Sequence, residues 1–104
     1  MPSSASRKGY SGEREVVHML RELGWKAKRA FGSDGRSMGT YSDVDIKAKK
    51  GDLEILIQVK RRKRFAVYNF FKNSDVVAIR ADHKQWLYIL TEEMFKSVSH
   101  LIKK

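Results

Sequence analysis

The sequence predicts an α/β protein in which a small mixed β-sheet is flanked by helices, in the order α-β-β-β-α-β-β-α. Three observations predict this class: helical spacing of apolar residues after Ser11, two alternating segments around Gly51-Asp52, and a capped apolar stripe at the end of the chain. A chain of 104 residues has room for one hydrophobic core. We therefore expect a single domain over 11–104 and a flexible basic arm over 1–10.

The first predicted helix begins at Ser11, which can serve as its N-cap, and ends near Gly24. Its apolar residues recur at intervals of three and four, as Val16, Val17, Leu20 and Leu23. The alternation over 25–31 predicts a short strand. The following stretch, 32–40, is polar and rich in glycine, which indicates a loop.

The segment over 43–60 predicts a β-hairpin. If Gly51-Asp52 is its two-residue loop, opposed positions add up to 103. One face then consists of apolar pairs, namely Val44 with Val59, Ile46 with Ile57 and Ala48 with Ile55. These contacts hold the register against a slip of one residue. The other face opposes Asp45 to Gln58 and Asp43 to Lys60.

The remaining third of the chain alternates between helical and extended patterns. We expect a short amphipathic helix over 65–72 and strands over 76–81 and 86–90. Thr91 can cap a last helix that runs to about Ile102 and carries an apolar stripe. These elements complete the predicted order α-β-β-β-α-β-β-α.

Charge indicates a polyanionic partner. The chain has 22 Lys or Arg against 12 Asp or Glu, and half of the excess of +10 lies in the run Lys60–Arg64. Such a run alone is more typical of a solvated loop or a targeting patch. The absence of cysteine excludes disulfides and thiol catalysis. No apolar run has membrane-spanning length, so we expect a cytoplasmic protein with no membrane partner.

One patch of the predicted hairpin combines groups suited to phosphodiester hydrolysis. Asp45 and Gln58 can converge on a small ion, because cross-strand partners have Cβ atoms about 5 Å apart. Hard cations such as Mg²⁺ take oxygen ligands and retain waters. Lys60 lies on the same face and can act on water or on phosphate charge. Glu13, on the inward side of the first helix, can supply a further acid, although taken alone it is better explained by stabilisation of the helix dipole.

The set of motifs resembles the PD-(D/E)xK nuclease superfamily and, within it, the archaeal-type Holliday-junction resolvases. The segments that carry the resemblance are Gly12-Glu13-Arg14-Glu15, Arg29-Ala30-Phe31-Gly32-Ser33, Val44-Asp45-Ile46 and Ile55-Leu56-Ile57-Gln58-Val59-Lys60. Order, spacing and context agree from about Lys8 to Arg64, whereas the last third agrees only in the order of its elements. The resemblance implies a restriction-endonuclease-like core.

The resemblance also implies the residues of a site. Mg²⁺, or alternatively Mn²⁺, would be held by Glu13, Asp45 and Gln58, with Lys60 and the loop residue Ser33 completing the catalytic set. DNA phosphates would meet basic side chains, namely Arg29, Arg36, Arg61, Arg62, Lys63 and Arg64. The implied substrate is branched DNA, above all the four-way junction. Two symmetric cuts require two active sites, so the protein is expected to be a homodimer, joined through 65–71 or the final helix.

Two departures from the family pattern leave alternatives open. Val44-Asp45 replaces a proline-aspartate pair and leaves Asp43 as a competing ligand, and Gln58 stands where most members carry glutamate. Other nucleases of the same fold remain alternatives, whether nicking, flap, single-strand or restriction-type. A catalytically inactive DNA-binding module is a third. The compact chain suits a nucleoid-associated protein or a viral or phage-encoded one.

Overall fold

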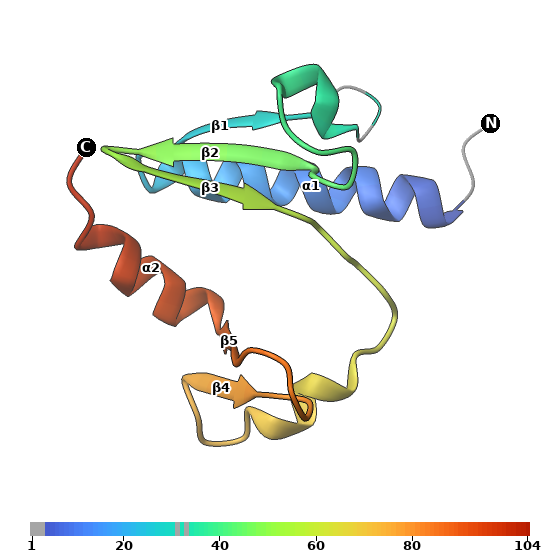
Figure 1. The fold of residues 1–104 in the computed structure, drawn as a ribbon, viewed down its shortest axis with the longest axis vertical. Coiled ribbons are helices and arrows are strands. Elements are labelled where there is room, and N and C mark those ends of the chain that lie inside the picture. The colour runs from blue at the N-terminus through green and yellow to red at the C-terminus, as the bar shows by residue number, and fades with distance from the viewer. Residues whose placement is uncertain (1–3, 31, 33) are drawn as a thin grey trace. The chain divides into compact units, whose positions relative to one another are not determined.

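The computed structural model describes residues 4–30, 32 and 34–104, with side chains from Ser11 onward (Figure 1). The elements are α1 (Ser4–Glu22), β1 (Lys26–Arg29), the 3-10 helix η2 (Gly35–Met38), β2 (Ile46–Lys50), β3 (Leu53–Ile57), the 3-10 helix η3 (Ala66–Phe70), β4 (Val76–Ile79), β5 (Leu87–Leu90) and α2 (Glu92–His100). The predicted α/β class is confirmed, and the elements are compatible with a restriction-endonuclease-like fold. Within the described residues, the strands form two antiparallel sheets, one of three strands and one of two.

The chain divides into two compact units, which we call unit 1 and unit 2. Unit 1 runs to Arg62 and also includes Ile102–Lys104, while unit 2 covers Lys63–Leu101. Each is described by itself below. A single domain over 11–104 remains a prediction.

Helix α1 begins at Ser4, so the prediction of a start and N-cap at Ser11 is wrong. The only proline of the chain, Pro2, precedes this stretch, and every residue from Ser4 onward has the amide that a helix needs. The predicted end is confirmed, because Gly24 has a φ of +91° and the helix stops at Glu22.

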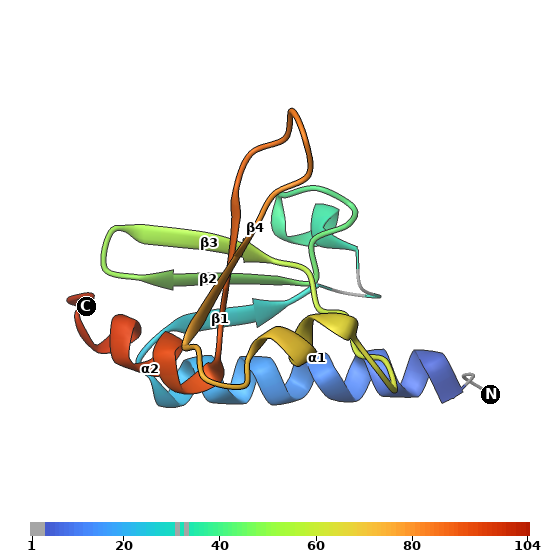
Figure 2. The ribbon, with the colours of Figure 1, turned by 90° about the horizontal axis from the view of Figure 1, so that it is seen from below.

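Unit 1 is a three-stranded sheet with α1 along one face (Figures 1 and 2). The hairpin of β2 and β3 has the predicted register, with Ile46 opposite Ile57 and Ala48 opposite Ile55. Strand β1 pairs with the other side of β2. The buried apolar residues lie between helix and sheet: Val17, Leu20, Trp25, Ala27, Ala30, Val44, Ile46 and Ala48. This core is therefore the support for any site at the ends of the strands.

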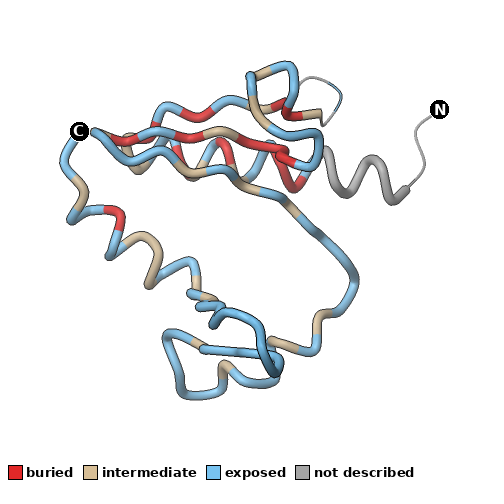
Figure 3. Tube along the Cα trace, viewed as in Figure 1, coloured by how far each residue is buried: buried red, intermediate tan, exposed pale blue. Residues whose placement is uncertain are grey.

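Unit 2 contains η3, the β4–β5 hairpin and α2. The segment expected as a short amphipathic helix over 65–72 is the 3-10 helix η3, and none of its residues is buried. The predicted cap of the last helix is confirmed, because Thr91 Oγ1 accepts a hydrogen bond from Met94 N at 3.2 Å. In Figure 3 the buried segments lie almost entirely in unit 1. Unit 2 thus holds its elements together with little buried apolar surface.

Candidate active site

Asp45 lies just before β2 and is held by three hydrogen bonds. Its carbonyl accepts from Ala30 N at 2.8 Å, and its own amide donates to the Ile57 carbonyl at 2.9 Å. Its carboxylate oxygen Oδ2 accepts from Val59 N at 2.7 Å. The residue is only 9% exposed. Asp45 is therefore a buried carboxylate fixed at the point where β1, β2 and β3 meet.

The structure separates the two aspartates that the sequence leaves in competition. Asp43 is exposed, whereas Asp45 is buried and tied to the two neighbouring strands. A carboxylate held in one position can present an oxygen to a cation without losing side-chain entropy. The geometry therefore favours Asp45 as the ligand.

The predicted cross-strand pair of Asp45 and Gln58 lies just beyond the regular ladder, whose last pair is Ile46 with Ile57. At that point the Asp45 amide bonds to the carbonyl of Ile57, and its carboxylate takes the amide of Val59. A side chain thus replaces a ladder hydrogen bond. As a result Asp45 is bonded to the residues on either side of Gln58.

Glu13 is a second buried carboxylate, at 4% exposure, on the face of α1 that meets the sheet. Its Oε1 lies 3.8 Å from Nε of Arg29, whose side chain is 24% exposed. Since α1 starts at Ser4, Glu13 is well beyond the first turn, and stabilisation of the helix dipole does not explain its position. A buried carboxylate is costly unless paired, and Arg29 offsets that cost. The prediction that Arg29 contacts DNA stays a prediction, and the structure adds that this side chain lies beside Glu13.

A closed series of contacts between segments, which we call the ring, includes these two carboxylates. A Cβ placed on Gly12 would lie 3.4 Å from Cγ1 of Val59 and 3.5 Å from Cδ of Arg61. The segment after β3 therefore passes directly over α1 next to Glu13. The contacts run from Gly12-Glu13 through Arg29-Ala30 and Asp45 to Val59, and then back to Gly12. Described residues from all four segments that carry the family resemblance therefore take part in one chain of contacts.

Gln58 and Lys60 are both exposed on the segment that completes this ring. They alternate with Val59 and Arg61, which approach Gly12. The backbone of the two predicted site residues is thus beside Asp45, while their side chains are accessible to solvent. Ser33, the predicted loop serine, lies outside the described residues.

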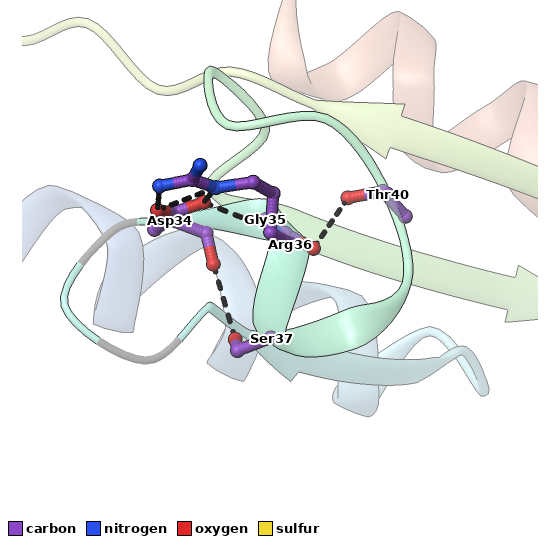
Figure 4. Close-up of polar contacts among 5 residues, drawn as sticks. All are labelled: Asp34, Gly35, Arg36, Ser37 and Thr40. Atoms are coloured by element: carbon purple, nitrogen blue, oxygen red, sulfur yellow. Dashed lines mark hydrogen bonds and ion pairs between the residues drawn. The ribbon is translucent and has the colours of Figure 1, made fainter.

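The loop before β2 is braced by its own polar contacts (Figure 4). Asp34 caps η2 by accepting from Arg36 N at 3.0 Å, and both of its oxygens accept from the Arg36 guanidinium. These hydrogen bonds hold the pKa of the Asp34 carboxyl below its ordinary value of 3.8 and raise the pKa of Arg36. The Arg36 head group, expected to contact DNA, is engaged by Asp34.

Gly35 fits this loop because its position has no room for a side chain. A Cβ at Gly35 would meet the Tyr41 carbonyl and Thr40 Oγ1 and lie 2.8 Å from Cβ of Val44. Thr40 Oγ1 in turn donates to the Gly35 carbonyl at 2.8 Å. The loop is thus packed against the residue before Asp45, which helps to fix the start of β2.

Exposed basic side chains are found on the segment after β3 and along α1. Residues 61–64 are all exposed, although the stem of Arg61 packs on Gly12. A groove of about 690 Å³ along α1 is lined by Ser11, Arg14, Glu15, Val17, His18, Arg21 and Arg29. Arg14 and Arg21 were not among the predicted DNA contacts. Their separation of seven residues places them on one helix face.

The donor set fits a hard divalent cation. Asp45 and Glu13 offer carboxylate oxygens, and Gln58 offers an amide oxygen. Mg²⁺ is usually bound by one or two carboxylates and keeps several waters. No group of three or more His, Cys, Asp or Glu side chains suited to a metal is found in the described part of the chain.

Comparison with protein families identifies one family. The family model described as archaeal Holliday junction resolvase matches residues 4–102. Comparisons with curated proteins and with solved structures return no match. Over the described residues, no helix has the length and apolar character to cross a membrane. The match includes the ring of motifs and the whole of unit 2.

Proposed function

This chain belongs to the archaeal Holliday junction resolvase family, a family of DNA-processing nucleases, and from that premise we propose that it is a Mg²⁺-dependent endonuclease that cuts four-way DNA junctions. The observation that carries the proposal is the closed ring of contacts that brings Glu13 and Asp45, both buried, to the backbone beside Gln58 and Lys60. Buried carboxylates are costly and cluster at functional sites.

Asp45, Glu13 and Gln58 are the proposed ligands. The hydrogen bond from Val59 N fixes Oδ2 of Asp45 and leaves Oδ1 in a defined position for the cation. Arg29 acts as a positioning residue, because it balances the charge of Glu13 and restricts its side chain. When bound, a divalent cation polarises the phosphoryl group and activates water.

Lys60 is the proposed charge partner of the scissile phosphate. It is exposed on the segment that Asp45 anchors through Val59, so its ammonium group can reach a bound backbone. A cation at that position offsets the negative charge that builds on the phosphate during hydrolysis. Ser33 is proposed as a further contact with the scissile phosphate on the family resemblance alone.

The basic residues are proposed to position the DNA. Arg61–Arg64 follow Lys60 directly, and the groove along α1 adds Arg14 and Arg21 on the other side of Glu13. Contacts of this kind neutralise phosphates without reading bases. The substrate is then selected by the path of its backbone, as a branched structure requires.

We further propose that the active form is a homodimer. Resolution of a four-way junction requires two symmetric cuts, and the ring of motifs provides one set of site residues in each chain. Unit 2 supplies apolar surface for such an interface, because Tyr68 and Phe70 of η3 and Leu101 after α2 are more than half exposed.

A non-catalytic DNA-binding module is the second candidate, and Gln58 is the observation that favours it. An amide in place of a carboxylate removes one negative charge from the ligand set and weakens cation binding. This candidate predicts salt-sensitive junction binding without cleavage.

Two matched variants test the proposal in a junction cleavage assay with and without Mg²⁺. Asp45→Asn removes the charge of the buried ligand, and we expect it to lower cleavage by about 100-fold or more while junction binding in EDTA remains. Asp43→Asn, two residues away and exposed, should leave cleavage near that of the wild type. Loss of cleavage in the Asp43 variant alone would contradict the site assignment. Junction binding by an inactive wild-type protein would favour the second candidate.

A further inference from the structure

The β4–β5 hairpin of unit 2 presents aromatic and cationic side chains on one face. Its register places Ala78 opposite Tyr88 and ends with Ile79 opposite Leu87. Arg80 directly follows this last pair on one strand, and Trp86 directly precedes it on the other. Trp86 is 51% exposed and Tyr88 is 68% exposed. We call the surface formed by these two exposed aromatic residues, Ala78 and Arg80 the aromatic platform.

The guanidinium group of Arg80 lies over the ring of Trp86. Its Cζ lies 5.2 Å from the centre of the Trp86 ring. A cation at this distance is attracted by the ring and is held close to its face. Lys84, in the turn that joins the strands, is exposed at the same end of the hairpin. The platform therefore combines exposed π-surface with positive charge.

These features fit unstacked nucleobases. Proteins that bind single-stranded nucleic acid combine aromatic side chains, on which bases stack, with cations that track the phosphates. A second copy of the same face would bring Arg80 and Lys84 against their own equivalents, which disfavours a symmetric contact through this platform. The positive charges of Arg80 and Lys84 instead favour a polyanion as the ligand of the platform.

We infer that the aromatic platform binds unpaired bases of a DNA substrate, with Trp86 as the main stacking residue and Arg80 as a phosphate contact. The choice of DNA as the ligand rests on the proposed function. The inference adds a contact for opened strands to the contacts proposed for the cutting site. Recognition would then include base stacking at a branch point in addition to backbone contacts.

Intrinsic fluorescence gives a direct test on the full chain. The chain has two tryptophans, of which Trp25 is buried at 4% exposure and Trp86 is half exposed. A short oligothymidylate in EDTA should quench the Trp86 emission, because thymine stacks on the indole ring. A blunt two-stranded DNA duplex of equal charge, which has no unpaired bases, should quench it much less. Equal quenching by both, or none, would overturn the inference.

Two substitutions separate stacking from packing. Trp86→Phe keeps an aromatic ring, while Trp86→Leu keeps only apolar volume. By anisotropy of a labelled oligothymidylate, Trp86→Leu should weaken binding by about 5- to 100-fold, and Trp86→Phe should keep most of the affinity. Equal affinities of the two variants would contradict a stacking role. Dissociation of an oligomer by Trp86→Leu, with DNA binding unchanged, would assign the platform to a second copy.

Arg80→Gln provides an independent measurement. Loss of one phosphate contact should reduce the slope of log affinity against log salt concentration by about 0.7 for a single strand. An unchanged slope would remove Arg80 from the interface. Since these experiments contain no divalent cation and measure no cleavage, their failure leaves the proposed nuclease intact. Conversely, absence of cleavage would leave the binding of unpaired bases standing.

Discussion

Units 1 and 2 differ in what they bury. All of the buried apolar residues belong to unit 1, where α1 covers the sheet. Most of the exposed large apolar side chains belong to unit 2, among them Tyr68, Trp86, Tyr88 and Leu101. Both units contain an antiparallel hairpin and a helix, so the difference is in packing and not in the kind of element.

This difference assigns separate roles to the units. The carboxylates of unit 1 need a rigid support, since a ligand that moves cannot position a cation, and the core beneath β1 and β2 provides it. A two-stranded hairpin is only marginally stable alone. The exposed apolar surface of unit 2 is therefore available for partners, whether a second protomer or unpaired bases.

The largest expected effect comes from truncating an apolar side chain in each unit. Leu20 of α1 is fully buried, whereas Leu87 of β5 is 51% exposed. Leu20→Ala should cost about 2–5 kcal/mol of unfolding free energy, because it leaves a cavity. Leu87→Ala should cost less than about 1 kcal/mol. Chemical denaturation monitored by circular dichroism at low protein concentration measures both.

An equal cost for the two variants would break the comparison between the units. It would mean that the Leu87 side chain is buried in solution by a contact that the single chain does not contain. Repeating the Leu87→Ala measurement at several protein concentrations then identifies the cover, since a second protomer makes the cost depend on concentration.

A smaller effect is expected at the cap of α2. Thr91→Ala removes the hydrogen bond from Met94 N to Oγ1 and should cost about 1 kcal/mol. If unit 2 opens as its own cooperative unit, amide exchange will accelerate in β5 and α2 and remain unchanged in β2. Thr91→Ser, which keeps the hydroxyl, is the matched control. Acceleration in both units would show that the chain unfolds as one body.

The sequence predicts the hairpin of unit 1 in detail and unit 2 only in outline. Two-residue periodicity and a short turn determine which residues of β2 and β3 face each other, so the register could be read without coordinates. Element types in unit 2 followed equally from periodicity. Periodicity shows which face of an element is apolar but not which residues cover that face. For this reason the exposure of Trp86 and Tyr88 was not predicted.

The site shows the same division between local and long-range information. The choice of Asp45 as a ligand stays a prediction, and the structure adds that this residue is buried. The bond from Val59 N to its carboxylate and the pairing of Arg29 with Glu13 were not predicted, because each joins residues far apart in sequence. The start of α1 was missed for a different reason. A polar stretch with modest helix propensity carries no apolar signal, although it can extend a helix that packing already stabilises.

The smallest effect concerns the loop that packs beside Asp45. Arg36 holds the pKa of Asp34 below 3.8, so their contact is fully present above pH 3.8 and is lost as pH falls through the lowered pKa. Arg36→Gln should raise the Asp34 pKa toward 3.8, which a carboxyl NMR titration can measure. Because both groups are exposed, added salt should reduce the difference. An Asp34 pKa that is the same in wild type and variant would show that the pair does not brace this loop in solution, and the rigidity of unit 1 around Asp45 would then rest on Gly35 and the strands alone.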